Sequence, residues 1–210
     1  MLLMKTHFLC SQQLPLLTQT AAAIYVVRDP ADVMLSNFHY SQRSAGAPPA
    51  ETADLLDRYV DSFIRERGDP RWRSRGMGSW DENVRSWLET PHSFPVLLVR
   101  YEDLLADPGG VAGVIGRFLG LNRTPEQVSA AVASASFERM RQIEERDISA
   151  RSIGIFYKPY LQGSIAAGLR FMRSGRSGEG ARTLSAEQGR RFDEALGPLA
   201  RKLGYRMPGG

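Results

Sequence analysis

Two short apolar runs, far apart in the chain, share one pattern. Ile24–Val27 reads IYVV and Val96–Val99 reads VLLV, with no polar residue between the apolar ones. Continuous β-branched, aliphatic and aromatic residues are typical of strands covered on both faces, as in a parallel sheet. Leu2–Phe8 is a further short candidate strand. The pattern therefore predicts buried parallel strands rather than half-exposed antiparallel ones.

A helix-start signal follows each of the two runs. Asp29-Pro30 comes just after the first, and Asp107-Pro108 follows the second. An aspartate at such a position accepts a hydrogen bond from a free amide of the first turn, and a proline has its φ preset and no amide to satisfy. Strands alternating with helices predict an α/β fold in which helices flank a mostly parallel sheet in three layers.

Helical periodicity and capping boxes predict the remaining helices. The capping boxes begin at Ser79, Thr124 and Ser185, and the expected helices are 52–67, 79–88, 108–119, 124–133, 136–146 and 185–203. Between the last two of these helices, Phe171–Arg182 mixes glycines with arginines. Such a loop can wrap its amides around an anion while arginines supply charge, although many loops of this composition are plain surface.

Arg28 and Ser36 lie on either side of the first predicted helix start, Asp29-Pro30. Arg28 stands at the carboxyl end of the first strand, and Ser36 lies about two turns into the helix. The carboxyl end of a parallel strand followed by a helix N-terminus is where open α/β sheets bind anionic ligands. An ordinary strand–helix junction, with Arg28 ion-paired to Asp29 or Asp32, explains the same residues. From this stretch alone both interpretations stay open.

Composition narrows the class of protein. The chain has 210 residues, which suits one domain, and a net charge of +4. All basic residues except three lysines are arginines, which fits anionic ligands and equally fits a high-GC genome. The single cysteine, Cys10, excludes an internal disulfide and a cysteine-based metal site, and predicts a cytoplasmic protein. No apolar run is long enough for a membrane helix, and polar residues from His7 onward interrupt any signal peptide.

Several stretches together resemble one family. YVVRDPADVMLSNFHY, VRYEDLLADP and FMRSGRSGEGARTLSAEQ occur in the order and approximate spacing found in sulfotransferases that use 3′-phosphoadenosine 5′-phosphosulfate (PAPS). LLMKTHF at the start is similar to that family's Lys-Thr-His strand, and ASFERM to its adenine-side segment. The resemblance covers nearly the whole chain.

The resemblance implies a role for individual residues. Arg28 and Ser36 would hold the 3′-phosphate of the cofactor, His7 would remove the proton of the acceptor, and Lys5 would lie near the transferring sulfuryl group. The residues expected around adenine, and over the adenosine and its 3′-phosphate, are Tyr101, Phe137, Phe171, Met172, Arg173 and Gly175. Ser174 stands where many relatives carry lysine. No metal is expected.

One part of the family pattern is missing. The strand-loop-helix that reads roughly Tyr-Pro-Lys-Ser-Gly-Thr in the family, and that cradles the 5′-phosphosulfate, does not occur in this sequence. We therefore interpret 1–210 as a single sulfotransferase-like domain that lacks this strand-loop-helix. Nucleotide affinity is expected to persist in part, with sulfuryl transfer severely impaired. A sheet without its inner strand is expected to self-associate or to be poorly soluble.

The leading hypothesis is transfer of a sulfuryl group from PAPS, leaving adenosine 3′,5′-bisphosphate (PAP), to a hydroxyl of a small-molecule acceptor. GSWDENVRSWLE and FERMRQIEERD resemble bacterial members that sulfate glycopeptide natural products. The alternative is a truncated, non-catalytic 3′-phosphoadenosine-binding or interaction module. Nucleic-acid binding is disfavoured because aromatic residues are sparse among the arginines, and no membrane partner is expected. A homo-oligomer stays open, since the family's dimer motif is not matched at 181–190.

Overall fold

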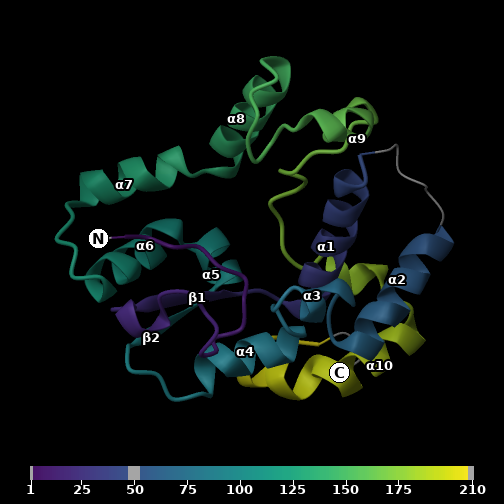
Figure 1. The fold of residues 1–210 in the computed structure, drawn as a ribbon, viewed down its shortest axis with the longest axis horizontal. Helices are drawn as coiled ribbons and strands as arrows, with labels where there is room; N and C mark the ends of the chain where they lie inside the picture. The colour runs from purple at the N-terminus through teal and green to yellow at the C-terminus, as the bar shows by residue number, and fades with distance from the viewer. Residues whose placement is uncertain (1, 47–52, 208–210) are drawn as a thin grey trace.

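The computed structural model describes residues 2–46 and 53–207. Its sheet, within those residues, has two parallel strands, β1 (Ala23–Val27) and β2 (Val96–Arg100), with Ala23 beside Val96 and Val27 beside Arg100. Both strands predicted from the apolar runs are confirmed. Figure 1 shows helices grouped around this sheet and extending to one side of it. The fold is therefore the expected α/β class, a parallel sheet flanked by helices.

Leu2–Phe8 does not form the expected strand. Its backbone is instead held by side chains of α4 (Trp80–Leu88): the Asn83 amide donates to the His7 carbonyl oxygen at 3.1 Å, and the Trp87 indole donates to that of Phe8 at 3.0 Å. The next amide, Leu9, donates to the Gly76 carbonyl. Because these contacts occupy the backbone groups, this N-terminal segment (2–10) runs over α4 without pairing with a strand.

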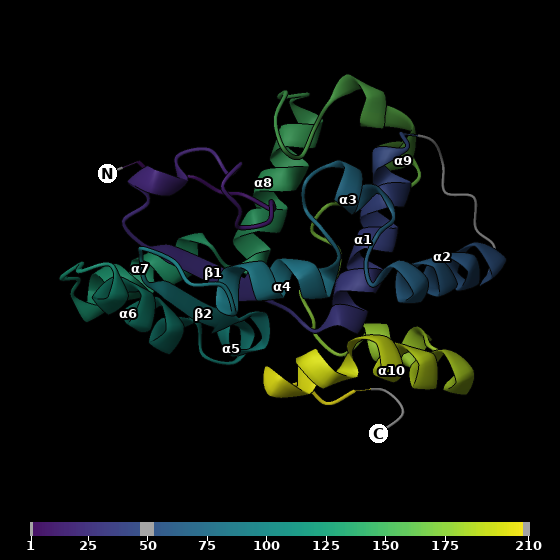
Figure 2. The ribbon, with the colours of Figure 1, turned by 60° about the horizontal axis from the view of Figure 1, so that its bottom comes forward.

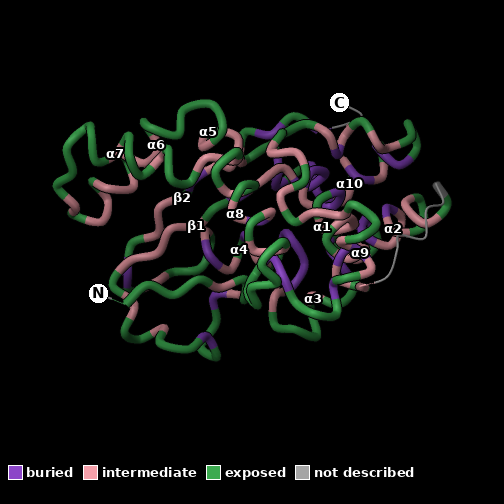
Figure 3. The backbone as a smooth tube through the Cα atoms, turned by 90° about the horizontal axis from the view of Figure 1, so that it is seen from above, coloured by how far each residue is buried: buried purple, intermediate pink, exposed green. Residues whose placement is uncertain are grey.

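The two strands are less covered than continuous apolar runs suggest. Val26 in β1 is 51% exposed and Leu98 in β2 is 39% exposed. Figure 3 shows the β1–β2 region dominated by intermediate and exposed backbone, in contrast to the buried stretches near α1 and α10. The expectation of cover on both faces therefore fails at these two side chains, because nothing in the described residues packs fully over them.

Ten α-helices and three 3₁₀ turns occur in the described residues. Besides α4, the helices are α1 (Pro30–Ser44), α2 (Ala53–Glu66), α3 (Arg71–Ser74), α5 (Tyr101–Ala106), α6 (Pro108–Phe118), α7 (Pro125–Ser134), α8 (Phe137–Ser149), α9 (Gln162–Ala166) and α10 (Ala186–Lys202). The 3₁₀ turns are η1 (Leu17–Gln19), η2 (Pro159–Leu161) and η3 (Gly180–Thr183). The described helices include none that is both long and apolar enough to span a bilayer.

The predicted helix starts are confirmed in atomic detail. The Asp29 carboxylate accepts from the amides of Ala31 and Asp32, and Asp107 accepts from Gly110. The capping boxes at Ser79, Thr124 and Ser185 are complete, with both reciprocal hydrogen bonds formed. These side chains satisfy amides that have no partner inside the helix. The start of the helix expected at Thr52 lies outside the described residues.

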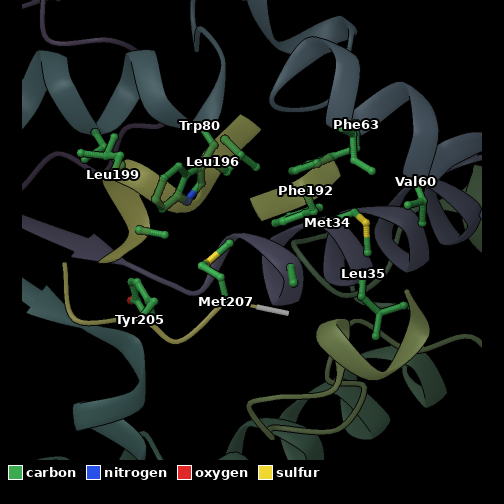
Figure 4. Close-up of a cluster of buried hydrophobic side chains, with 14 of the residues drawn as sticks. Met34, Leu35, Val60, Phe63, Trp80, Phe192, Leu196, Leu199, Tyr205 and Met207 are labelled. Carbon is green, nitrogen blue, oxygen red and sulfur yellow. The ribbon is translucent and has the colours of Figure 1, made fainter. Parts of the chain in front are cut away.

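The main core lies between helices rather than on the sheet. Met34 of α1, Phe63 of α2 and Phe192 of α10 are each fully buried, and Trp80 of α4 joins them. The rings of Phe63 and Phe192 are stacked with centroids 6.2 Å apart. Figure 4 shows these side chains converging from the four helices, and Figure 2 shows α10 packed beneath α1 and α2. This packing fixes α1, the helix that follows Arg28.

A smaller core anchors the N-terminal segment. Cys10 and Leu14 pack with Trp87 and Phe94. The Cys10 sulfur lies 3.6 Å from Nδ1 of His92, whose Nε2 is 3.0 Å from the Trp87 carbonyl oxygen. Because Nε2 must donate to that carbonyl, Nδ1 is the acceptor and the thiol donates to it. Burial raises the pKa of Cys10, which keeps it a thiol.

Candidate functional site

Arg28 connects three parts of the chain at the carboxyl edge of the sheet. Its guanidinium lies 4.4 Å from the centroid of the Tyr101 ring, and its Nη2 donates to the Arg176 carbonyl oxygen at 2.9 Å. Arg28 follows β1 and Tyr101 follows β2, so parallel pairing brings them to the same edge. Arg176 comes from the glycine- and arginine-rich loop that the sequence singled out at 171–182, of which residues 171–180 are called segment 171–180 below.

Arg28 also forms the ion pair of the alternative interpretation. Its Nη2 lies 3.5 Å from the Asp32 carboxylate, one turn along α1. The Nε atom of Arg28 is buried and has no hydrogen-bond partner in the part of the chain that the structure describes. The ordinary junction contact is therefore present, yet it leaves one donor of the guanidinium unused. An acceptor is needed to complete this group.

Asp32 fixes one end of segment 171–180 on α1. Its side chain is buried, and its two oxygens accept from the amides of Gly178, at 2.7 Å, and Gly180, at 2.8 Å. A Cβ placed on Gly180 would lie 2.1 Å from the backbone of Ala31. Only glycine allows so close an approach, so this end of the segment lies directly on the first turn of α1.

Glu144 of α8 fixes the other end. This carboxylate is fully buried and accepts from the amides of Phe171, at 2.6 Å, and Met172, at 2.8 Å. Arg43 of α1 lies 3.8 Å from it, also buried, and donates to the Phe156 carbonyl oxygen. Two buried carboxylates, one on α1 and one on α8, thus hold the segment between the two helices.

The middle of the segment contacts Phe137. Gly175 has φ of +63°, and a Cβ placed on it would lie 2.5 Å from the Phe137 ring, so glycine is required for conformation and for space. Glu179 accepts from Arg173 and from the Ser174 hydroxyl, and chiefly through the latter bond its pKa is lowered. The position where relatives carry lysine is therefore used here for an internal contact.

Phe171 and Ser36 lie along the same side of α1. Phe171 is 38% exposed, with its ring against those of Tyr40 and Phe156. Ser36 is exposed and lies one turn beyond Asp32, and residues four apart share a helix face. The face of α1 that carries Asp32, Ser36, Tyr40 and Arg43 is thus the one that segment 171–180 follows.

His7 and Lys5 lie apart from this network. Both side chains are exposed on the N-terminal segment, where the surrounding protein and then the Lys5 ammonium lower the pKa of His7. Asn83, which holds the His7 carbonyl, also accepts from the Tyr25 hydroxyl of β1 at 3.0 Å. Among residues 2–46 and 53–207, no hydrogen bond or ion pair joins His7 or Lys5 to Arg28, Ser36 or segment 171–180.

Several residues of the network escaped sequence analysis. No sequence motif marks Glu144 or Arg43, and Asp32 is marked only as a possible ion-pair partner of Arg28. Glu102 was also missed: it accepts from the Asp29 amide at 3.1 Å and from the Tyr205 hydroxyl at 2.9 Å, linking the C-terminal stretch to the junction. One signal was available for Glu144, since it lies seven residues after Phe137 and therefore on the same face of α8.

The residues around Arg28 fit the phosphate and adenine of a 3′-phosphoadenosine nucleotide. Arg28 has a buried, unused donor, Arg173 and Arg176 are exposed nearby, and Tyr101 and Phe137 supply aromatic rings. Guanidinium groups and loop amides are the usual ligands of phosphate.

Comparisons with known proteins identify the family of the chain. The sulfotransferase domain, as a family model, matches residues 1–204. Sulfotransferase 1A1 of dog is 31% identical over 193 residues, covering 91% of this chain and 59% of that protein. Sulfotransferase 2A1 of rat is 30% identical over 181 residues, covering 86% and 57%. The chain thus spans less than two thirds of the length of these relatives.

Solved structures share the fold. Mouse sulfotransferase SULT7A1 complexed with PAP superposes with a TM-score of 0.63 at 23% identity, covering 89% of this chain and 60% of the other. Retinol dehydratase in complex with androsterone and the inactive cofactor PAP gives a TM-score of 0.65 at 21% identity, covering 97% and 54%. With the match of the domain over 1–204, the chain belongs to the sulfotransferase family.

Proposed function

We propose that the chain binds 3′-phosphoadenosine nucleotides at the end of β1 and acts in sulfuryl transfer from PAPS to a hydroxyl of a small molecule. The observation that carries the proposal is the convergence of Arg28, Tyr101 and segment 171–180 at one edge of the sheet. Family membership and relatives solved with PAP support the choice of nucleotide. The glycopeptide acceptor remains a hypothesis based on two short stretches of sequence.

Arg28 is the proposed ligand of the 3′-phosphate. Its planar guanidinium can grip a phosphate with two donors, and its buried Nε has no hydrogen-bond partner among the described residues. Phosphate must compete with the Asp32 carboxylate, 3.5 Å from Nη2, and with the Arg176 carbonyl. Ser36, one turn beyond Asp32, offers a hydroxyl donor. Tyr101 and Phe137 offer ring faces to adenine.

His7 is the proposed general base, with Lys5 beside it. When bound, PAPS supplies a sulfuryl group attached to a phosphate, and this phosphate is a good leaving group when the acceptor attacks the sulfur. His7 takes the proton of the acceptor hydroxyl, a task that requires a neutral imidazole. Its lowered pKa keeps the imidazole neutral at physiological pH. Lys5 supplies a positive charge where negative charge develops.

A second candidate function is nucleotide binding without catalysis. It is favoured by one observation: Arg28 contacts Tyr101 and segment 171–180, whereas within the described chain His7 and Lys5 have no hydrogen bond or ion pair to any of these. A chain that binds PAP and transfers no sulfuryl group would fit this candidate.

Calorimetric titration with PAP tests the site. We expect saturable binding by the wild-type chain and an affinity at least about tenfold lower for Arg28→Ala, since a charge-assisted contact is lost. Arg190→Ala, an exposed arginine paired only with Glu187 on α10, is the matched control and should bind as wild type. Absence of saturable binding by the wild type would overturn the proposal.

Radiolabelled sulfate transfer separates the two candidates. With labelled PAPS and phenol as the hydroxyl acceptor, sulfotransferase activity predicts labelled product that is lost in His7→Ala while PAP binding is kept. Binding without any labelled product, across a panel of phenols and alcohols, favours the non-catalytic module.

A further inference from the structure

The buried ion pair of Arg43 and Glu144 has no role in the function proposed so far. Arg43 and Glu144 are 3% and 0% exposed, and they join α1 to α8 at 3.8 Å. Burying two charges costs more than such a pair usually returns, so a pair of this kind is weak support for stability by itself. The other contacts of Glu144 indicate its role.

Glu144 uses both oxygens on backbone amides of the same segment. One oxygen accepts from Phe171 and the other from Met172. Hydrogen bonds from amides to a carboxylate are shorter and stronger than neutral ones. Phe137, two turns earlier on the same face of α8, contacts Gly175 in that segment. One face of α8 therefore sets both the start and the middle of the segment.

We propose that Glu144 is a positioning residue for the nucleotide, fixing the amides of Phe171 and Met172 so that segment 171–180 is ordered before ligand arrives. This inference rests on the proposed function, because it assigns the segment to nucleotide binding. A loop ordered in advance loses less conformational entropy on binding, and affinity rises accordingly. Arg43 supplies the counter-charge that lets the carboxylate remain buried.

Hydrogen exchange of the ligand-free wild-type chain tests the ordering without any variant. The amides of Phe171 and Met172, which donate to Glu144, should exchange at least about tenfold more slowly than that of Ser177, for which the described contacts give no acceptor. Equal exchange at these three amides would overturn the inference.

Glu144→Gln tests the role of the carboxylate. Glutamine has one acceptor oxygen, so its NH₂ group must face one of the two amides. We expect faster exchange at Phe171 and Met172, with the Gly180 amide, held by Asp32, still protected. General loss of structure would instead speed exchange at both ends. PAP affinity should fall about tenfold or more.

Two further variants complete the test. Glu145→Gln removes the same charge from the next residue of α8, where the carboxylate contacts only the Arg170 side chain, and should match wild type. Glu144→Gln alone leaves the buried charge of Arg43 without its partner. The double variant Arg43→Met/Glu144→Gln removes that charge as well, and it should still bind PAP weakly. If the wild type binds PAP and Glu144→Gln binds equally well, only this inference fails. If the wild type does not bind PAP, the proposed function fails with it.

Discussion

Two regions of the molecule are packed very differently: the helical half, formed by α1, α2, α4 and α10, and the sheet half, formed by β1, β2 and the N-terminal segment. Met34, Phe63 and Phe192 are completely buried between α1, α2 and α10, whereas Val26 and Leu98 in the strands are 51% and 39% exposed. In the N-terminal segment Leu3 reaches 85% exposure. Segment 171–180, which carries several of the proposed nucleotide ligands, is fixed on the well-packed α1 by Asp32, whereas His7, the proposed base, lies on the exposed N-terminal segment. Binding is thus expected to be the better organised of the two tasks.

Core truncation tests the contrast most strongly. Phe192→Ala removes a ring stacked on Phe63 and should lower the free energy of unfolding by about 3–5 kcal/mol. Val26→Ala, in the half-exposed strand, should lower it by less than about 1 kcal/mol. Denaturant unfolding followed by circular dichroism measures both. Similar losses in the two variants would contradict the difference between the halves.

Gly180→Ala addresses the contact of segment 171–180 with α1. The added methyl group would lie 2.1 Å from the Ala31 backbone, and overpacking of this kind costs about 1–3 kcal/mol. Weaker PAP binding should accompany the loss of stability. Gly109→Ala on α6, where the nearest atom is at 3.8 Å, is the control. Unchanged stability in Gly180→Ala would show that the segment does not lie on α1 in solution.

The exposed strands predict self-association of this chain. Val26 and Leu98 present apolar side chains on a two-stranded sheet, and strand edges readily pair with other chains. Sedimentation should show association that Val26→Lys weakens about tenfold, since lysine at a strand surface opposes such pairing. A monomeric wild-type chain at tens of micromolar would count against this.

The pH dependence of sulfuryl transfer is expected to report on His7, which lies on the exposed N-terminal segment. Because its surroundings and Lys5 lower the pKa of His7, the neutral base persists below the usual value of 6.5. The midpoint of the acid limb of kcat/KM should therefore lie below pH 6.5, and Lys5→Gln should move this midpoint to higher pH. A limb above pH 6.5, or one unmoved by Lys5→Gln, would argue against His7 as the base.

Local signals in the sequence predicted both strands of the sheet and most of the helices, but not α3, α5 or α9. The Asp29-Pro30 start and the three capping boxes depend on residues within four positions of one another, and all formed as expected. The strand predicted at Leu2–Phe8 was wrong. A strand forms only beside another strand, and the apolar pattern of these residues does not show whether one is present. The predicted cover of Val26 and Leu98 failed because an apolar run does not show whether another layer packs over each face of the sheet.

The site was predictable where a motif marks it. The structure brings Arg28, Tyr101, Phe137 and Gly175 into one network, although their roles remain proposals. Glu144 was not predicted, because a charged residue in a charged helix is normally expected to face solvent. Its amide partners are 27 and 28 residues away, a distance that no local pattern reports.

The single thiol has a practical consequence. Cys10 is buried, donates to His92 and lies three residues after His7. An alkylating reagent such as iodoacetamide can reach it only when the surrounding cluster opens, since the thiol is inaccessible in the closed form. The rate of Cys10 labelling therefore measures how often the N-terminal segment, which carries His7, separates from α4.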